Sequence, residues 1–221
     1  MSDLQTATIT EILGDDRWAA DRISGLDPDA RRLYALILYR FTEGGPPDRG
    51  ELSRLGLDQD ALSELVERDL VALGPDGQVA VAYPFSTMPT RHQVRTEHGQ
   101  SYWAMCAIDA LGMPYLLHQA AEIRARAPGS DRAITVAIDP SVRTVRADPT
   151  EAAVVVARAG DGCAASCACP HINLFASTAA AERYLVGSDL HGAILDVGAA
   201  TAAGRRVFGD LLDRLGASTR Q

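Results

Sequence analysis

The sequence predicts an α+β protein in which an N-terminal helical, winged-helix-like domain precedes a core of mixed β-sheet with flanking helices. Three observations predict this class. Apolar residues recur at helical spacing before residue 70, and a hairpin signal follows them. Runs rich in β-branched residues come after residue 130, and helices and strands mix without a steady βαβ rhythm. We therefore divide the chain into a winged-helix-like domain, residues 1–83, and an α+β domain, residues 84–221.

The first domain is predicted from helix caps and one turn. Asp27-Pro28 has the form of an N-cap followed by a first-turn proline, and Pro75-Asp76-Gly77 is a turn sequence. We expect, in order, a helical segment around residues 9–13, a helix from Asp27 through Phe41, a short helix with a capping box from Asp48 to Glu51, a helix from Asp58 to Leu70, and the strands Val71–Leu73 and Gln78–Ala82.

The second domain is predicted from apolar runs. We expect an irregular connection over residues 84–100, a buried helix Tyr102–Leu117 kinked at Pro114, the strands Ala133–Ile138, Val142–Arg146, Ala153–Ala157, Ile172–Phe175 and Ala193–Val197, a helix Ala179–Leu185 capped by Thr178, and a final amphipathic helix Arg205–Leu215.

The charge is unevenly distributed along the chain. The 21 basic and 29 acidic residues give a net charge of -8, and the first 83 residues carry all of this excess. In a winged helix the helix after Asp58 would enter the DNA groove, yet it carries Asp60, Glu64 and Glu67. Such a helix would be repelled by phosphates, so we expect no nucleic-acid partner.

No apolar run approaches the roughly 18 residues of a membrane helix. The first residues, Met1-Ser-Asp-Leu-Gln, lack the basic and apolar regions of a signal peptide. We therefore expect a cytoplasmic protein that has no membrane partner.

Cys106 and Asp109 lie three residues apart in an apolar segment, so a helix would project both side chains from one face. Burial raises the pKa of a carboxyl group, which would let Asp109 hold a proton near neutral pH and deliver it as a general acid. The alternative is structural: Cys106 fills the core, and Asp109 binds a backbone amide of a nearby loop.

Three further cysteines cluster in the segment 163–171, where Cys163, Cys167 and Cys169 precede His171. Thiolates select thiophilic metal ions, and in a reducing compartment close cysteines are more often catalytic or metal-binding than disulfide-bonded. The spacing is not the paired Cys-x2-Cys of structural zinc sites. Incidental cysteines on a loop, and a histidine that serves only the core, are the alternatives.

Taken together, the two segments resemble the organomercurial lyase (alkylmercury lyase) family. That family has a Cys-x2-Asp helix and, some sixty residues later, a Cys before a segment that ends in Phe-Ala-Ser. The matching residues are Cys106, Asp109 and Cys169, with the segment from His171 to Ser177 as the downstream match. The resemblance extends over most of the chain, including the winged-helix-like region.

The resemblance implies a catalytic second domain that cleaves the carbon–mercury bond by protonolysis. Cys106 and Cys169 would grip mercury as thiolates, and Asp109 would protonate the carbon leaving group and briefly hold the Hg(II) product. The implied substrates are organomercurials such as methylmercury or phenylmercury. No resident cofactor is implied, only low-molecular-weight thiols that remove Hg(II), and mercuric reductase is the implied acceptor of the metal.

Some residues depart from the family pattern. Ala168 and Pro170 stand where the family commonly has an aromatic residue and a cysteine, and Cys163 and Cys167 are additional thiols and further candidate mercury ligands. The alternative functions are a metal-binding or metal-sensing module built on the clustered cysteines, a transcriptional regulator built on the winged helix, and a relative recruited to other chemistry.

Overall fold

The computed structural model describes residues 19–54, 59–160, 164–188 and 190–216 of the chain. The predicted helical segment around residues 9–13 lies outside these ranges. The described helices are α2 (Ala19–Ser24), α3 (Pro28–Glu43), α4 (Arg49–Arg54), α5 (Gln59–Glu67), α6 (Ala107–Leu117), α7 (Ala164–Cys167), α8 (Thr178–Ser188), α9 (Val197–Phe208) and α10 (Leu211–Arg214), with a 3₁₀ turn, η2 (Cys169–His171).

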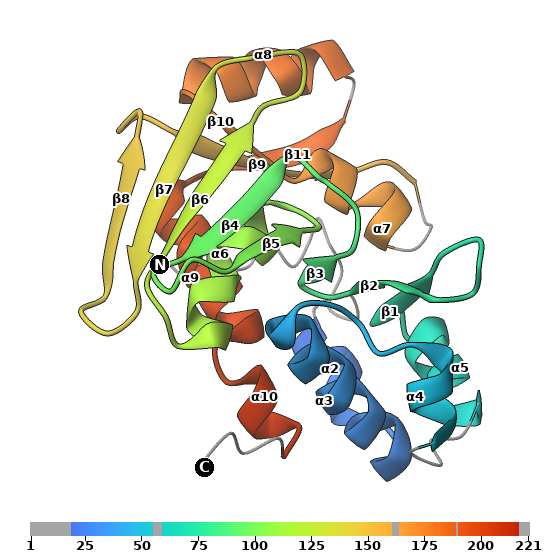
Figure 1. Cartoon of the computed structure of the whole chain (residues 1–221). Helices are drawn as coiled ribbons and strands as arrows, with labels where there is room; N and C mark the ends of the chain where they lie inside the picture. The colour runs from blue at the N-terminus through green and yellow to red at the C-terminus, as the bar shows by residue number, and fades with distance from the viewer. Residues whose placement is uncertain (1–18, 55–58, 161–163, 189, 217–221) are drawn as a thin grey trace.

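The strands form two sheets. The larger has eight strands in the order β1-β2-β3-β5-β4-β6-β7-β8, and the smaller has the order β10-β9-β11. In Figure 1 the helices α2 to α5 gather beside the hairpin β1–β2, and strands β4 to β8 fan out away from them. The strands are β1 (Val71–Leu73), β2 (Val79–Ala82), β3 (Phe85–Ser86), β4 (His92–Thr96), β5 (Ser101–Ala104), β6 (Ala121–Arg126), β7 (Ala133–Asp139), β8 (Thr144–Asp148), β9 (Ala153–Arg158), β10 (Asn173–Phe175) and β11 (His191–Asp196).

The N-terminal helices follow the predicted order. The Asp27 side chain accepts a hydrogen bond from the backbone N–H of Asp29 and so caps α3, and Pro28 begins that helix. Asp48 accepts from the backbone N–H of Glu51, as a capping box requires. The helices are followed by the predicted hairpin, whose second strand pairs with β3 and so joins the larger sheet. That these elements form a winged helix stays a prediction.

The mixed sheet that the sequence predicts is not found, because every strand pair in the described ranges is antiparallel. The predicted irregular connection over residues 84–100 contains β3 and β4, and residues 102–104 of the predicted buried helix belong to strand β5. Strands β3 and β4 are short and carry polar side chains, so their apolar signal is weak, whereas the apolar residues of β5 run directly into those of α6 and look like one segment. The α+β class itself is confirmed.

Two predictions near the C-terminus also need correction. The predicted final helix Arg205–Leu215 is divided between the end of α9 and α10, with Gly209 between them. The residue that caps α8 is Ser177 rather than Thr178, because the Ser177 hydroxyl accepts from the backbone N–H of Ala180.

Helices α6 and α9 pack against each other with almost no space between their backbones. A Cβ atom added at Gly112 would lie 2.7 Å from the carbonyl oxygen of Gly204, and one added at Gly204 would lie 2.6 Å from the carbonyl oxygen of Ile108. Only glycine at both positions permits this approach. The close contact fixes α6, which is buried along nearly its whole length, in the centre of the molecule.

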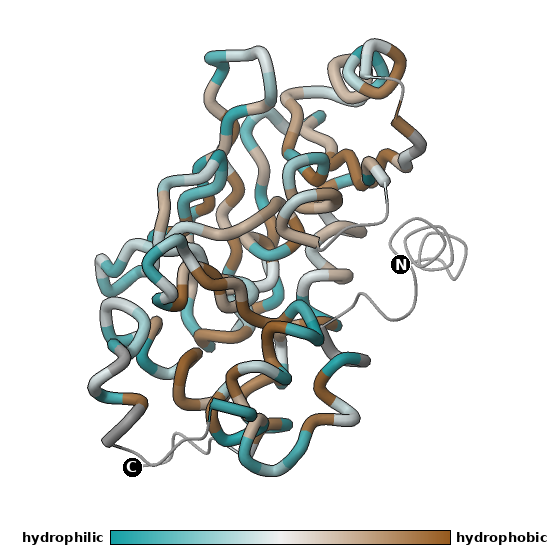
Figure 2. The backbone as a smooth tube through the Cα atoms, turned by 90° about the vertical axis from the view of Figure 1, so that its right-hand side faces the viewer, coloured by the Kyte–Doolittle hydropathy of each residue, from teal (hydrophilic) through white to brown (hydrophobic). Residues whose placement is uncertain are grey.

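None of the described helices is long and apolar enough to cross a membrane. Hydrophobic and hydrophilic stretches alternate along the described chain in Figure 2.

Candidate active site

The first part of the site is the N-terminus of α6. Cys106 is the N-cap residue, with an extended backbone, and Asp109 is the third residue of the helix. An acidic side chain at this position can turn back toward the N-cap residue, as in a capping box. The Asp109 carboxyl group interacts in this way with the thiol and the backbone of Cys106.

Cys169 begins the 3₁₀ turn η2, directly after α7 and before β10. Strand β10 pairs with β9 at one edge of the smaller sheet, which fixes the position of this segment. The backbone N–H of Ala107 donates to the carbonyl oxygen of Ile172 at 3.0 Å. This hydrogen bond ties the start of α6 to the turn that carries Cys169.

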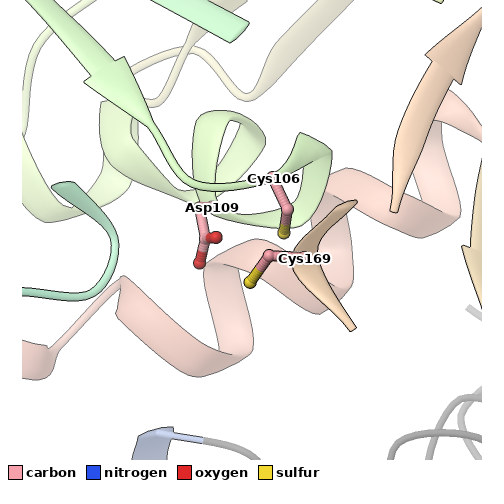
Figure 3. A group of neighbouring side chains, drawn as sticks. All are labelled: Cys106, Asp109 and Cys169. Atoms are coloured by element: carbon pink, nitrogen blue, oxygen red, sulfur yellow. The ribbon is translucent and has the colours of Figure 1, made fainter. Parts of the chain in front are cut away.

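The structure brings Cys106, Asp109 and Cys169 together, as Figure 3 shows. One sulfur or carboxylate oxygen from each of them lies within 4.8 Å of the others. All three residues are buried, with relative exposures of 3%, 5% and 6%. Two sulfur ligands and one oxygen in a site shielded from water suit a soft, thiophilic metal ion.

Burial controls the protonation of the site. It raises the pKa of Asp109 to about 7, although hydrogen bonds from the thiol and backbone of Cys106 act in the opposite direction. Burial also raises the pKa of Cys106 well above its usual value, and the hydrogen bond with Cys169 and the charge of Asp109 add to this rise. Near neutral pH, Asp109 is therefore present in both its protonated and its ionised form, while Cys106 stays a thiol.

Tyr83 is a neighbour of the site that the sequence did not predict. The Cys169 thiol donates to its hydroxyl oxygen at 3.9 Å, and burial raises the pKa of Tyr83 far above its usual value. The hydroxyl of Tyr34 on α3 donates to the carbonyl oxygen of Tyr83 at 2.8 Å. The N-terminal helices thus hold a residue that contacts the site. A lone tyrosine at the end of a predicted hairpin carries no signal of this role.

The other candidate residues lie apart from the three-residue group. Cys167 is buried, and its sulfur lies 3.9 Å from a guanidinium nitrogen of Arg158 on β9. The Nδ1 atom of His171 lies 3.3 Å from the hydroxyl of Tyr184 on α8. Cys163 lies outside the described residues. Of the clustered cysteines, the structure therefore brings Cys169 to Cys106 and Asp109.

Comparisons with known proteins point to one family. The alkylmercury lyase family (MerB) matches residues 85–209 of the chain. An alkylmercury lyase from Staphylococcus epidermidis (strain ATCC 12228 / FDA PCI 1200) is 25% identical over 156 residues, which cover 69% of this chain and 71% of that protein. The crystal structure of the mercury-bound form of MerB2 matches with a TM-score of 0.74 and 19% identity, covering 89% of this chain and 98% of that chain. The structural match shows a shared fold.

Proposed function

Because the chain belongs to the alkylmercury lyase family, we propose that it is an enzyme that cleaves carbon–mercury bonds by protonolysis, with Cys106, Cys169 and Asp109 as its catalytic residues. The observation that carries this proposal is the buried group of two sulfurs and one carboxylate oxygen within 4.8 Å of one another.

The two thiolates bind the mercury atom of the substrate. Mercury is a soft ion that prefers sulfur to oxygen or nitrogen. Two sulfur ligands push electron density toward the carbon atom, which makes that atom basic enough to accept a proton. The sulfurs of Cys106 and Cys169 are suited to this because both lie in the same buried site.

Asp109 delivers the proton to carbon. A carboxyl group with a pKa of about 7 holds a proton in a large part of the molecules at neutral pH and loses it readily. The neighbouring Cys106 thiol, whose own pKa is raised, supplies a proton when it binds mercury as a thiolate. The protonated Asp109 carboxyl group gives its proton to carbon, and the Cys106 sulfur then gives its own proton to the resulting Asp109 carboxylate as it binds mercury.

The reaction balances without an oxidant or a reductant. A cation R–Hg⁺ and two cysteine thiols give the hydrocarbon R–H, a mercury ion bound to two cysteine thiolates, and one proton. Mercury stays in the +2 state throughout. Asp109 then offers an oxygen ligand to the bound Hg(II).

Turnover requires removal of this Hg(II). We assign that step to low-molecular-weight thiols and propose mercuric reductase as the downstream acceptor of the metal. We place the reaction in the cytoplasm, since a reducing compartment keeps Cys106 and Cys169 in the thiol form that the chemistry needs. No resident cofactor is required by this scheme.

The test is the release of benzene from phenylmercury in the presence of excess thiol, measured by gas chromatography. Wild type is expected to form benzene, and Cys106→Ser/Cys169→Ser is expected to form none. Cys167→Ser is the matched control, because it removes a buried thiol that lies outside the group of three. We expect this control and Cys163→Ser to keep most of the activity.

Full activity in the double variant would overturn the assignment of the catalytic residues. Tight mercury binding without benzene from wild type would overturn the lyase proposal for this substrate and favour a metal-binding module.

A further inference from the structure

A pocket of about 360 Å³ adjoins Cys169 on the side where α8 and β4 approach η2. Its volume is near the lower end of the range of about 300–1,000 Å³ that small-molecule sites occupy. Of the described residues, Cys169 lines the pocket but Cys106 and Asp109 do not. The pocket therefore reaches the three-residue group through one of its two cysteines.

The pocket walls favour an anion. Arg91 is exposed at the pocket, His92 and His171 also line it, and none of its described lining residues is acidic. The positive charge of Arg91 reaches two other lining residues. Burial lowers the pKa of His92 and Arg91 adds to this fall, whereas burial raises the pKa of Tyr184 and Arg91 opposes the rise. A negatively charged group in the pocket would lie in this positive field.

His92 gives a second, independent indication of a ligand. The residue is only 1% exposed, and within the described ranges neither of its ring nitrogens has a hydrogen-bond partner. Burial, with a smaller effect from Arg91, lowers its pKa to about 3, so the imidazole is neutral and offers one donor and one acceptor. Buried polar groups are normally paired, and an unpaired one in a pocket wall is a place where a ligand can bind.

We propose that this pocket binds the small thiol that removes Hg(II), and that it selects a thiol bearing a carboxylate, with Arg91 as the carboxylate partner and His92 as a hydrogen-bonding partner. This inference rests on the proposed function, because the protein needs a thiol that removes Hg(II) only if its reaction leaves Hg(II) bound at the site.

The position of the pocket indicates that it holds the small thiol and not the organic group of the substrate. The carbon atom of the substrate must come within hydrogen-bond reach of Asp109 to be protonated. Asp109 does not line the pocket, whereas Cys169 does. A ligand in the pocket therefore approaches mercury from the Cys169 side, where a sulfur can exchange with that of Cys169.

The exchange is balanced. The sulfur of the first small thiol forms a bond to mercury, and the bond between mercury and Cys169 breaks. The proton of that thiol ends on the Cys169 sulfur. A second small thiol displaces Cys106 in the same way, so that mercury leaves with two small thiolates and both cysteines return to thiols.

The experiment measures thiol-driven release of Hg(II) from protein loaded directly with mercuric chloride. Mercaptoacetate, 2-mercaptoethanol and cysteamine supply an anionic, a neutral and a cationic thiol, compared at equal thiolate concentration because the thiolate is the attacking species. The mercury that stays on the protein is measured after rapid desalting. The variants are Arg91→Gln and Arg91→Glu, and Arg95→Gln is the matched control, because Arg95 is an exposed arginine of β4 that does not line this pocket.

For wild type, the rate of Hg(II) release is expected to saturate at a lower concentration of mercaptoacetate than of 2-mercaptoethanol or cysteamine. Arg91→Gln should raise the half-saturating concentration of mercaptoacetate by about tenfold, the loss of one charge-assisted contact, while that of 2-mercaptoethanol changes less than about twofold. Arg91→Glu should reverse the preference toward cysteamine, and Arg95→Gln should behave as wild type. Equal dependence on the three thiols, or an unchanged preference in Arg91→Gln, would overturn the proposal.

A second arm tests whether the pocket serves the substrate instead. Single-turnover hydrocarbon release is compared for phenylmercury and for 4-carboxyphenylmercury. If Arg91→Gln weakens capture of the carboxylated substrate and leaves mercaptoacetate release unchanged, the pocket holds the organic group and the thiol proposal is wrong. The release assay starts from mercuric chloride, so its result is independent of lyase activity. Failure of the proposed function would appear separately, as absence of benzene from wild type.

Discussion

Asp109 illustrates how the position of one residue defines its chemistry. A carboxyl group in water is ionised at neutral pH, but this one lies at the start of a buried helix beside two thiols. Its Oδ2 atom has no hydrogen-bond partner among the described residues. An unpaired buried oxygen disfavours the charged form, which is the reason that this residue can hold a proton where most aspartates cannot.

The pKa of Asp109 predicts how activity depends on pH. The acid form is the proton donor, so the single-turnover rate of benzene release should be highest below about pH 7 and fall as pH rises through that value. Asp109→Asn has no such proton to give, and we expect it to bind phenylmercury but to release benzene at least about 100-fold more slowly. Rapid-quench measurements across the pH range would check both results. A wild-type rate that rises through neutral pH would contradict the role of Asp109 as the acid.

Cys106 and Asp109 were predicted as a pair because a thiol and an acid at helical spacing are chemically distinctive, and Cys169 was joined to them through the resemblance to the alkylmercury lyase family. Tyr83 was not predicted, since its contact with Cys169 depends on how β2, β3 and η2 meet in space. His92 was not predicted as part of a site for the same reason. Residues close in sequence to a motif are visible in one sequence, whereas those brought to it by tertiary packing are not.

At the scale of elements, the helices with clear caps were predicted well and the polar strands poorly. The ends of α3 and the hairpin β1–β2 follow from residues such as Pro28 and Gly77, whose backbone preferences are strong. Strand β6 is not predicted from the sequence, although Ala121, Ile123 and Ala125 alternate with charged residues and are buried in the core. Alanine gives a weak apolar signal, so the period of two in this segment is faint.

The contact between α6 and α9 predicts the effect of one added methyl group. Gly204→Ala would place a Cβ atom 2.6 Å from the carbonyl oxygen of Ile108 and force the helices apart. We expect a loss of about 1–3 kcal/mol in the free energy of unfolding, measured with urea, and a slower single turnover because α6 carries Asp109. Gly187→Ala in α8 is the control. A Cβ atom there meets nothing within 4 Å, so its stability should equal or exceed that of wild type.

At the scale of the whole molecule, the predicted boundary at Tyr83 falls within a continuous structure. The larger sheet runs from β1 across to β8, and the rings of Phe41 on α3 and Phe85 on β3 stack with their centroids 5.1 Å apart. The hydroxyl of Tyr102 donates to the carbonyl oxygen of Thr42 at 3.0 Å. The N-terminal helices and the α+β part therefore share one hydrophobic core.

This shared core predicts that the residues before and after Tyr83 unfold together. Urea unfolding followed by far-ultraviolet and near-ultraviolet circular dichroism should give coincident transitions, as for one cooperative unit. A chain that begins at residue 84 should lose lyase activity, because it lacks Tyr83, which contacts Cys169, and Tyr34 on α3, which holds Tyr83 in place. Two separate transitions, or an active shortened chain, would instead establish residues 84–221 as an independent catalytic unit.

The hydrogen bond between Ala107 and Ile172 has a consequence for the strength of mercury binding. It holds the two sulfur-bearing segments together before any metal arrives, so the entropy lost in uniting them is lost during folding. The protein then acts as a preformed chelator, in which the second sulfur meets mercury at a high effective concentration once the first has bound. A single small thiol competes with such a chelate only if one sulfur is displaced and kept away while the other exchanges.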